Sequence, residues 1–162
     1  MARLPELTPD DEGASRLLPW VVAVMTFLAA LAAASGVALD RAVKSAEQFE
    51  LKGDLRRWRA VRDQIHAEVC RHGYHSELGV FTQYYGSPNL DASLLMMPLV
   101  GFLPAKDPRV ARTIDAIRNG LMSDGLVRRY SPDHSSEVDG LPPGEGAFLP
   151  CSFWLVDCLF LL

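Results

Sequence analysis

The residues best suited to chemistry lie in the last third of the chain. Arg129 and Tyr130 are adjacent, and Glu145 follows between two glycines. An arginine can bond several hydroxyl groups through its rigid fork of donors, and a tyrosine adds an aromatic face and a hydroxyl group. Flexible backbone around Glu145 can bring its carboxylate to a ligand. Taken alone, Arg128-Arg129 also fits the solvated end of a segment, and Glu145 fits a loop acid in water.

Two other polar groups are weaker candidates. One is a run of possible metal ligands, formed by His66, Cys70, His72 and His75. The spacing of these ligands fits no common zinc finger, so no metal site is predicted. The other is Ser131 with Asp133 and His134, which lacks the glycine pattern of a nucleophile elbow. We expect no cofactor.

Length, charge and cysteine content limit the class of protein. A chain of 162 residues suits one ordinary domain with its own core. The net charge of −4, without a basic cluster, argues against nucleic acid as a partner. On one helix, Cys151 and Cys158 would lie about 10 Å apart along the axis, too far for a disulfide. Reduced, buried thiols are therefore expected, which favours an intracellular protein.

Helices are predicted to hold most of these residues. Apolar residues at 55, 58, 61, 65 and 69 have helical spacing, and Gly73 can end that helix. Asp107 and Pro108 suit the start of a helix whose core face is Val110, Ile114, Ile117 and Leu121. The remaining expectations are an extended piece at 81–85, a helix over 91–101 started by Asp91, a long loop over 131–146, and an apolar helix over 147–162.

Five motifs, taken in order, carry a resemblance to a known family. They are Gly79-Val80-Phe81-Thr82-Gln83-Tyr84-Tyr85-Gly86, Leu90-Asp91-Ala92-Ser93-Leu94-Leu95, Asp107-Pro108-Arg109, Gly125-Leu126-Val127-Arg128-Arg129-Tyr130, and Glu145-Gly146-Ala147-Phe148-Leu149-Pro150-Cys151-Ser152-Phe153-Trp154. In their order and spacing they resemble glycoside hydrolase family 15, the bacterial glucoamylase- and trehalase-like enzymes. The resemblance covers the chain from about Ala38 to its C-terminus.

The resemblance implies a fold, an activity and a site. The fold would be all-α, with antiparallel α-hairpins forming part of the six-hairpin (α/α)6 toroid. The activity would be hydrolysis of α-glucosidic bonds in an α-glucan, a maltooligosaccharide or trehalose. Arg129 and Tyr130 match the family's arginine–tyrosine pair at the sugar subsite, and Glu145 would be a further sugar contact. Fungal members carry a tryptophan where this chain has Ala147.

The residues that would perform hydrolysis are not matched. Inverting hydrolysis needs a carboxylic acid and a carboxylate on opposite sides of the scissile bond. In the resembling enzymes the acid lies upstream of the region matching Ala38, and the base lies downstream of the last helix. The only glutamates in residues 1–37 are Glu6 and Glu12, which lie in a different sequence context. We therefore expect no catalytic residue, an inactive fragment, and exposed apolar surface on helices that lack their neighbours.

The N-terminal part does not resemble family 15. Residues 1–16 are polar and are expected to form a mobile tail. The run 17–39 carries no charge and would form a helix about 35 Å long, enough to span a membrane. A membrane span is the favoured interpretation, with a signal peptide or a buried core helix as alternatives. Leu18-Pro19-Trp20-Val21-Val22-Ala23 and the alanines that follow faintly resemble the first span of bacterial cell-division permease subunits.

These segments predict three parts: the tail 1–16, the apolar helix 17–39, and a truncated family 15-like domain over 40–162. Lysine and arginine are denser after the apolar run than before it, which would keep 40–162 cytoplasmic in a membrane-anchored chain. A cytoplasmic chain without a span is the alternative. A join near Ala38 would indicate a frameshifted remnant or a chimera. The alternative to a hydrolase fragment is a small single-span membrane protein whose helical part binds a protein partner.

Overall fold

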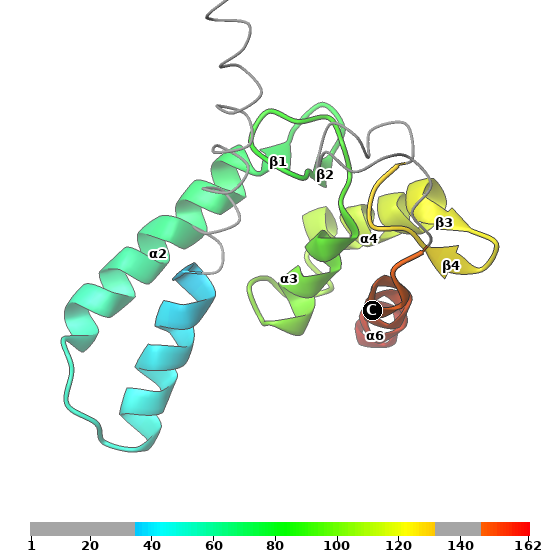
Figure 1. Cartoon of the computed structure of the whole chain (residues 1–162). Helices are drawn as coiled ribbons and strands as arrows, with labels where there is room; N and C mark the ends of the chain where they lie inside the picture. Colours follow the sequence, from blue (N-terminus) through cyan, green and yellow to red (C-terminus); the bar gives the residue numbers. More distant parts are fainter. Residues whose placement is uncertain (1–34, 132–146) are drawn as a thin grey trace, which may run out of the picture.

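The computed structural model describes residues 35–131 and 147–162, and it is mostly helical (Figure 1). A first helix over residues 35–48 and α2 (Leu55–His72) form an antiparallel hairpin at one side of the molecule. The carboxylate of Asp54 accepts the N–H of Arg57 at 3.0 Å and caps the start of α2. Gly73 ends α2, which confirms the stop predicted there.

The apolar stripe predicted along α2 is only partly buried. Val69 is buried, but Val61 is 37% exposed, so the prediction of one buried stripe was wrong at that position. The hairpin has few contacts with the rest of the described fold, because α2 contacts the remaining labelled elements chiefly through β1. Hydrophobic periodicity identifies the helix, but it does not show how many neighbours will cover the stripe.

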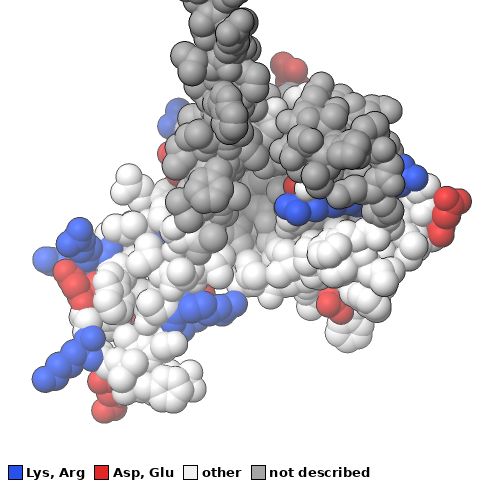
Figure 2. Space-filling model, in the orientation of Figure 1, with Lys and Arg blue, Asp and Glu red and all other residues white. Residues whose placement is uncertain are grey.

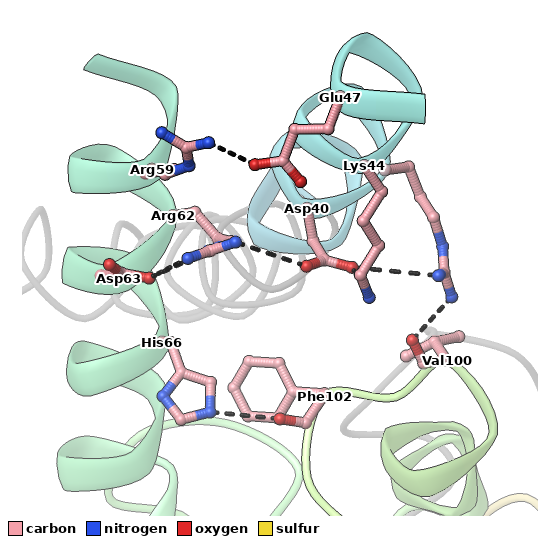
Figure 3. A network of polar contacts seen from close by, with 10 residues as sticks. Asp40, Lys44, Glu47, Arg59, Arg62, Asp63, His66, Val100 and Phe102 are labelled. Carbon is pink, nitrogen blue, oxygen red and sulfur yellow. Dashed lines mark hydrogen bonds and ion pairs between the residues drawn. The ribbon is translucent and has the colours of Figure 1, made fainter. Parts of the chain in front are cut away.

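Polar contacts link the two helices of the hairpin to each other and link the hairpin to the rest of the molecule (Figure 3). Asp40 pairs with Lys44 at 2.7 Å and with Arg62 at 3.6 Å. Arg41 donates to the carbonyl oxygen of Val100 at 2.8 Å. Charged side chains gather over this hairpin in Figure 2, whereas the surface over α6 carries few. The pair of Asp40 with Arg62 therefore links the two helices of the hairpin, whereas Arg41 links the hairpin to the segment after α3.

A short strand pair follows the hairpin. Strand β1 (Tyr74–His75) pairs antiparallel with β2 (Val80–Phe81), and Tyr74 lies opposite Phe81. Both residues of β2 are buried. The backbone N–H of Phe81 donates to Oγ1 of Thr113 at 2.9 Å, which ties β2 to the helix that crosses it. The extended piece predicted at 81–85 is thus centred slightly earlier.

The helix predicted over 91–101 occurs as two short pieces. A 3-10 helix, η1 (Ala92–Leu95), leads into α3 (Met96–Leu99), and the chain then turns at Gly101 with a φ of +74°. Asp91 accepts the N–H of Ser93 at 2.7 Å, which confirms its predicted role at a helix start. Pro98 lies in the last turn of α3, as expected for a residue that ends a helix.

Helix α4 (Pro108–Leu121) forms the centre of the core. Asp107 accepts the N–H of Arg109 at 2.9 Å, and Pro108 occupies the first position, as predicted. The predicted core face is confirmed, since its four residues are at most 4% exposed: Val110, Ile114, Ile117 and Leu121. These residues pack against Phe81, Leu95 and Val127 in the main hydrophobic cluster.

A hairpin of two strands follows α4. Strand β3 (Met122–Ser123) pairs antiparallel with β4 (Leu126–Val127). The two residues between them, Asp124 and Gly125, have φ values of +52° and +81°. Positive φ at both central residues is typical of the two-residue hairpin turn. Gly125 therefore lies in a tight turn shortly after the end of α4.

The last helix, α6 (Leu149–Leu161), matches the apolar helix predicted over 147–162. Its inner face is buried in the core and consists of Cys151, Leu155 and Cys158. All three cysteines of the chain are free thiols, as expected. The outer face is apolar too, and Phe153, Val156 and Phe160 are 67%, 63% and 89% exposed. The predicted exposed apolar surface is therefore present.

The predicted membrane span falls mostly outside the part of the chain that the structure describes. Within residues 35–131 and 147–162, no helix has the length and apolar character needed to cross a bilayer. The end of the span, residues 35–39, belongs to the first helix, which continues past residue 40 without a break. At Gly36 of this helix, an added Cβ would lie 3.0 Å from Cγ2 of Ile65. The tail 1–16 is not described.

Candidate functional site

The backbone of Arg129 is fixed from two sides. The N–H of Ala92, at the start of η1, donates to the carbonyl oxygen of Arg129 at 2.8 Å. The N–H of Arg128, the residue before Arg129, donates to the carbonyl oxygen of Leu121 at the end of α4, at 2.9 Å. The segment that carries the predicted arginine–tyrosine pair is thus bonded to two helices at once.

Helix α6 holds the same segment from a third side. The N–H of Val127 donates to the hydroxyl oxygen of Ser152 at 2.9 Å. Cys151, the neighbour of Ser152, is fully buried. Burial raises the pKa of the Cys151 thiol, the charge of Asp91 raises it further, and Arg129 opposes both. Cys151 is therefore a protonated packing residue close to the Asp91–Arg129 pair.

The side chain of Arg129 lies between an acid and an aromatic ring. Its Nε is 3.7 Å from Oδ1 of Asp91, and its guanidinium carbon is 5.0 Å from the centre of the Tyr130 ring. The Arg129 side chain is half exposed, whereas that of Asp91 is 8% exposed. A buried carboxylate thus faces a guanidinium that reaches solvent.

A polar cavity of about 200 Å³ opens beside Tyr130. Its polar lining residues come from three segments and are Gln83, Asn89, Tyr130 and Ser131. At about 30 Å³ per molecule, the cavity corresponds to roughly seven waters. The N–H of Gln83 donates to the carbonyl oxygen of Asn89 at 2.9 Å, which closes the loop around the cavity. Oε1 of Gln83 is buried and lacks a hydrogen-bond partner among the described residues.

A second, larger cavity has a different character. It measures about 440 Å³ and lies where the helical hairpin meets α3. Its lining is mainly apolar and includes Val37, Val69, Met97 and Phe102, with Gln83 at its edge. Ligands rich in hydroxyl groups need hydrogen-bonding partners, so the smaller polar cavity is the better candidate for such a ligand.

The possible metal ligands on α2 form a structural contact. His66 and Cys70 share a helix face, with Sγ 3.9 Å from Nδ1. Nε2 of His66 is 3.1 Å from the carbonyl oxygen of Phe102, and the two ring centroids are 4.7 Å apart with the rings tilted by 35°. Over residues 35–131 and 147–162, no group of three histidine, cysteine or acidic residues could hold a metal ion. Burial raises the pKa of the Cys70 thiol, while nearby Arg109 lowers it.

A helical hairpin, a buried acid, and an arginine–tyrosine pair whose tyrosine lines a partly polar cavity define a mostly helical protein with a recessed polar site. The chain belongs to glycosyl hydrolases family 15, whose family model matches residues 29–160. The predicted resemblance is therefore confirmed, but the match begins at residue 29 and not at about Ala38, so it includes part of the apolar run 17–39.

The relatives include several enzymes named trehalase. The trehalase of Mycobacterium tuberculosis is 51% identical over 123 residues, which are 76% of this chain and 18% of that protein. The trehalase of Thermoplasma volcanium is 39% identical over 129 residues, which are 79% of this chain and 20% of that protein. The chain thus spans about a fifth of the length of the curated relatives that it matches.

Solved glycosidases share the fold. A glycosidase variant in complex with glucose matches with a TM-score of 0.64 at 24% identity, covering 82% of this chain and 33% of that one. A second variant matches with a TM-score of 0.60 at 23% identity, covering 74% and 30%. The shared region is a helical part of a larger glycosidase fold, and the closed six-hairpin toroid stays a prediction.

The predicted site residues are thus placed in part. Tyr130 lines the polar cavity, Arg129 contacts the Tyr130 ring, and Glu145 falls outside the described residues. The sequence reading missed Gln83 and Asn89 as residues of the site. It assigned Asp91 only to a helix start, because no local pattern shows that this acid meets an arginine far along the chain.

Proposed function

We propose that this chain forms a sugar-binding part of a family 15 glycosidase that hydrolyses α-glucosidic bonds. Trehalose is the favoured substrate, because the relatives at 51% and 39% identity are named trehalases. Maltooligosaccharides and α-glucans are the alternatives. The observation that carries the proposal is the Arg129–Tyr130 pair, whose tyrosine lines a cavity together with the polar side chains of Gln83, Asn89 and Ser131.

The chemistry of this pair suits a sugar. The guanidinium of Arg129 reaches solvent and can donate to neighbouring hydroxyl groups through its rigid fork. The Tyr130 ring offers a flat apolar surface for the C–H face of a pyranose, and Gln83 has a buried acceptor oxygen without a partner among the described residues. Glu145 joins them as a proposed third contact, on the family resemblance.

Binding of trehalose and maltose by the purified chain tests the proposal. We expect calorimetry or ligand-detected NMR to show that Arg129→Ala and Glu145→Ala weaken binding. The loss of a charge-assisted hydrogen bond corresponds to about tenfold in affinity. Arg118→Ala is the matched control, since Arg118 is an exposed arginine in the last turn of α4 and is not part of the Asp91–Arg129–Tyr130 group. Unchanged affinity in both site variants would reject these roles.

We further propose that the segment does not hydrolyse sugars by itself, because its sequence matches neither catalytic glutamate of the family. Incubation of the purified chain with trehalose or maltose should release no glucose above the buffer control. Release at an enzyme-like rate would show that this chain contains a working acid and base.

The location of the chain in the cell and its division at residues 16 and 39 stay predictions. Membrane fractionation of the expressed chain tests the span over 17–39. Recovery in the membrane fraction after a carbonate wash would support it, and recovery in the soluble fraction would count against it.

A further inference from the structure

We infer that Asp91 is a positioning residue that aims the guanidinium of Arg129 at the sugar. The sugar is taken from the proposed function, whereas the orientation of Arg129 is a property of the chain alone. The orientation of Arg129 can therefore be tested without a ligand, and its role in sugar binding can be tested with one.

The burial of Asp91 requires a charged partner. Its side chain is 8% exposed, and a carboxylate removed from water is stabilised only by hydrogen bonds and opposite charge. Oδ1 accepts the N–H of Ser93 at 2.7 Å and lies 3.7 Å from Nε of Arg129. Because the acid is buried and the arginine is half exposed, the acid is the fixed member of the pair.

The backbone keeps the two residues in register. The N–H of Ala92, directly after Asp91, donates to the carbonyl oxygen of Arg129 at 2.8 Å. The Tyr130 ring then limits the guanidinium from the other side, at 5.0 Å. A long side chain held between an acid and a ring loses less conformational freedom when a ligand arrives, so the arginine is preorganised.

Helix capping alone is the competing explanation, and asparagine separates the two. Asp91→Asn keeps an Oδ1 acceptor for the Ser93 N–H but removes the charge that faces Arg129. Asp107 provides a matched control, because it also caps a helix and pairs with an arginine, Arg109, in another part of the fold. Asp107→Asn therefore perturbs an equivalent cap and ion pair without touching the site.

The first experiment follows the Nε–Hε signal of Arg129 in protein labelled with ¹⁵N-arginine. Arg129→Lys assigns the signal by removing it. In Asp91→Asn, and in Asp91→Ser as a second charge-free cap, we expect the signal to move toward the exposed arginines and its heteronuclear NOE to fall. Asp107→Asn should leave it in place. An unmoved signal with an unchanged NOE in both Asp91 variants would overturn the inference.

The second experiment measures trehalose affinity for the same variants. Asp91→Asn should weaken binding by about fivefold, the upper range for one partly exposed ion pair, with circular dichroism unchanged. Asp107→Asn should bind as the unmodified chain does. Wild-type affinity in Asp91→Asn would overturn the role in sugar binding. A complete lack of trehalose and maltose binding by the unmodified chain would instead refute the proposed function, and the NMR signal would still decide the orientation of Arg129.

Discussion

Replacement of Thr113 by valine should destabilise the fold by about 2 kcal/mol, although the two side chains have nearly the same shape. Thr113 is 2% exposed in the middle of α4. Its hydroxyl oxygen accepts the N–H of Phe81 at 2.9 Å, and its O–H donates to the carbonyl oxygen of Arg109 at 2.7 Å. Valine would leave the buried N–H of β2 without its acceptor, and an unsatisfied buried donor costs about 1–3 kcal/mol.

Thr113→Ser is the matched control. Serine keeps the hydroxyl group and removes one buried methyl group, which costs about 1 kcal/mol. The expected order of stability is therefore wild type, then Thr113→Ser, then Thr113→Val. Urea unfolding followed by tryptophan fluorescence gives the two free energies, provided that the m value stays constant. Hydrogen exchange should show faster exchange of the Phe81 amide in Thr113→Val than in Thr113→Ser.

The reverse order of stability would refute this reasoning. If the free energy of unfolding of Thr113→Val matched or exceeded that of Thr113→Ser, the hydrogen bond from Phe81 to Thr113 would contribute no net stabilisation. The attachment of β2 to α4 would then depend on apolar packing alone.

Three further predictions concern other parts of the fold. The hydrogen bond from Arg109 holds the pKa of Asp107 below its usual value, so the stability that Asp107 contributes is present above about pH 4 and is lost as the pH falls through its folded pKa. Urea unfolding of Asp107→Ala should show a deficit of about 1 kcal/mol at pH 7 that shrinks toward pH 3. Burial raises the pKa of Cys158 to about 11, so iodoacetamide at pH 8 should label it far more slowly in the folded chain than in urea, as read by mass spectrometry. Gly125→Ala, at a φ of +81°, should lower the free energy of unfolding by about 1 kcal/mol, whereas Gly120→Ala, a helical control with a nearest neighbour at 3.5 Å, should not lower it.

Local signals in the sequence were enough to predict α2 and α4. Asp107 starts a helix because its side chain accepts a backbone N–H of the first turn, and Pro108 suits the first position because it has no N–H to satisfy. Both effects act within a few residues. The four core positions of α4 follow from the helical period alone. The family resemblance, carried by motifs in order, correctly placed the chain among the glycosyl hydrolases.

Other features depended on contacts that the sequence pattern does not contain. The helix predicted over 91–101 is apolar on most sides, so periodicity could not reveal that it divides into η1 and α3. Asp91 meets Arg129 only because η1 and the segment after β4 lie side by side. The β3–β4 hairpin is different, because Asp124-Gly125 is a strong hairpin signal that the helical interpretation overlooked.

The small number of contacts between the helical hairpin and the core affects the order in which the chain unfolds. Residues 35–72 meet the core across a cavity of about 440 Å³ and through a small number of polar contacts, such as the bond from Arg41 to the carbonyl oxygen of Val100. Because few contacts cross this boundary, denaturant should release the hairpin as a separate cooperative unit before the core unfolds. Arg129 contacts Asp91, Ala92 and Tyr130, which all lie outside the hairpin, so its geometry would survive this partial unfolding.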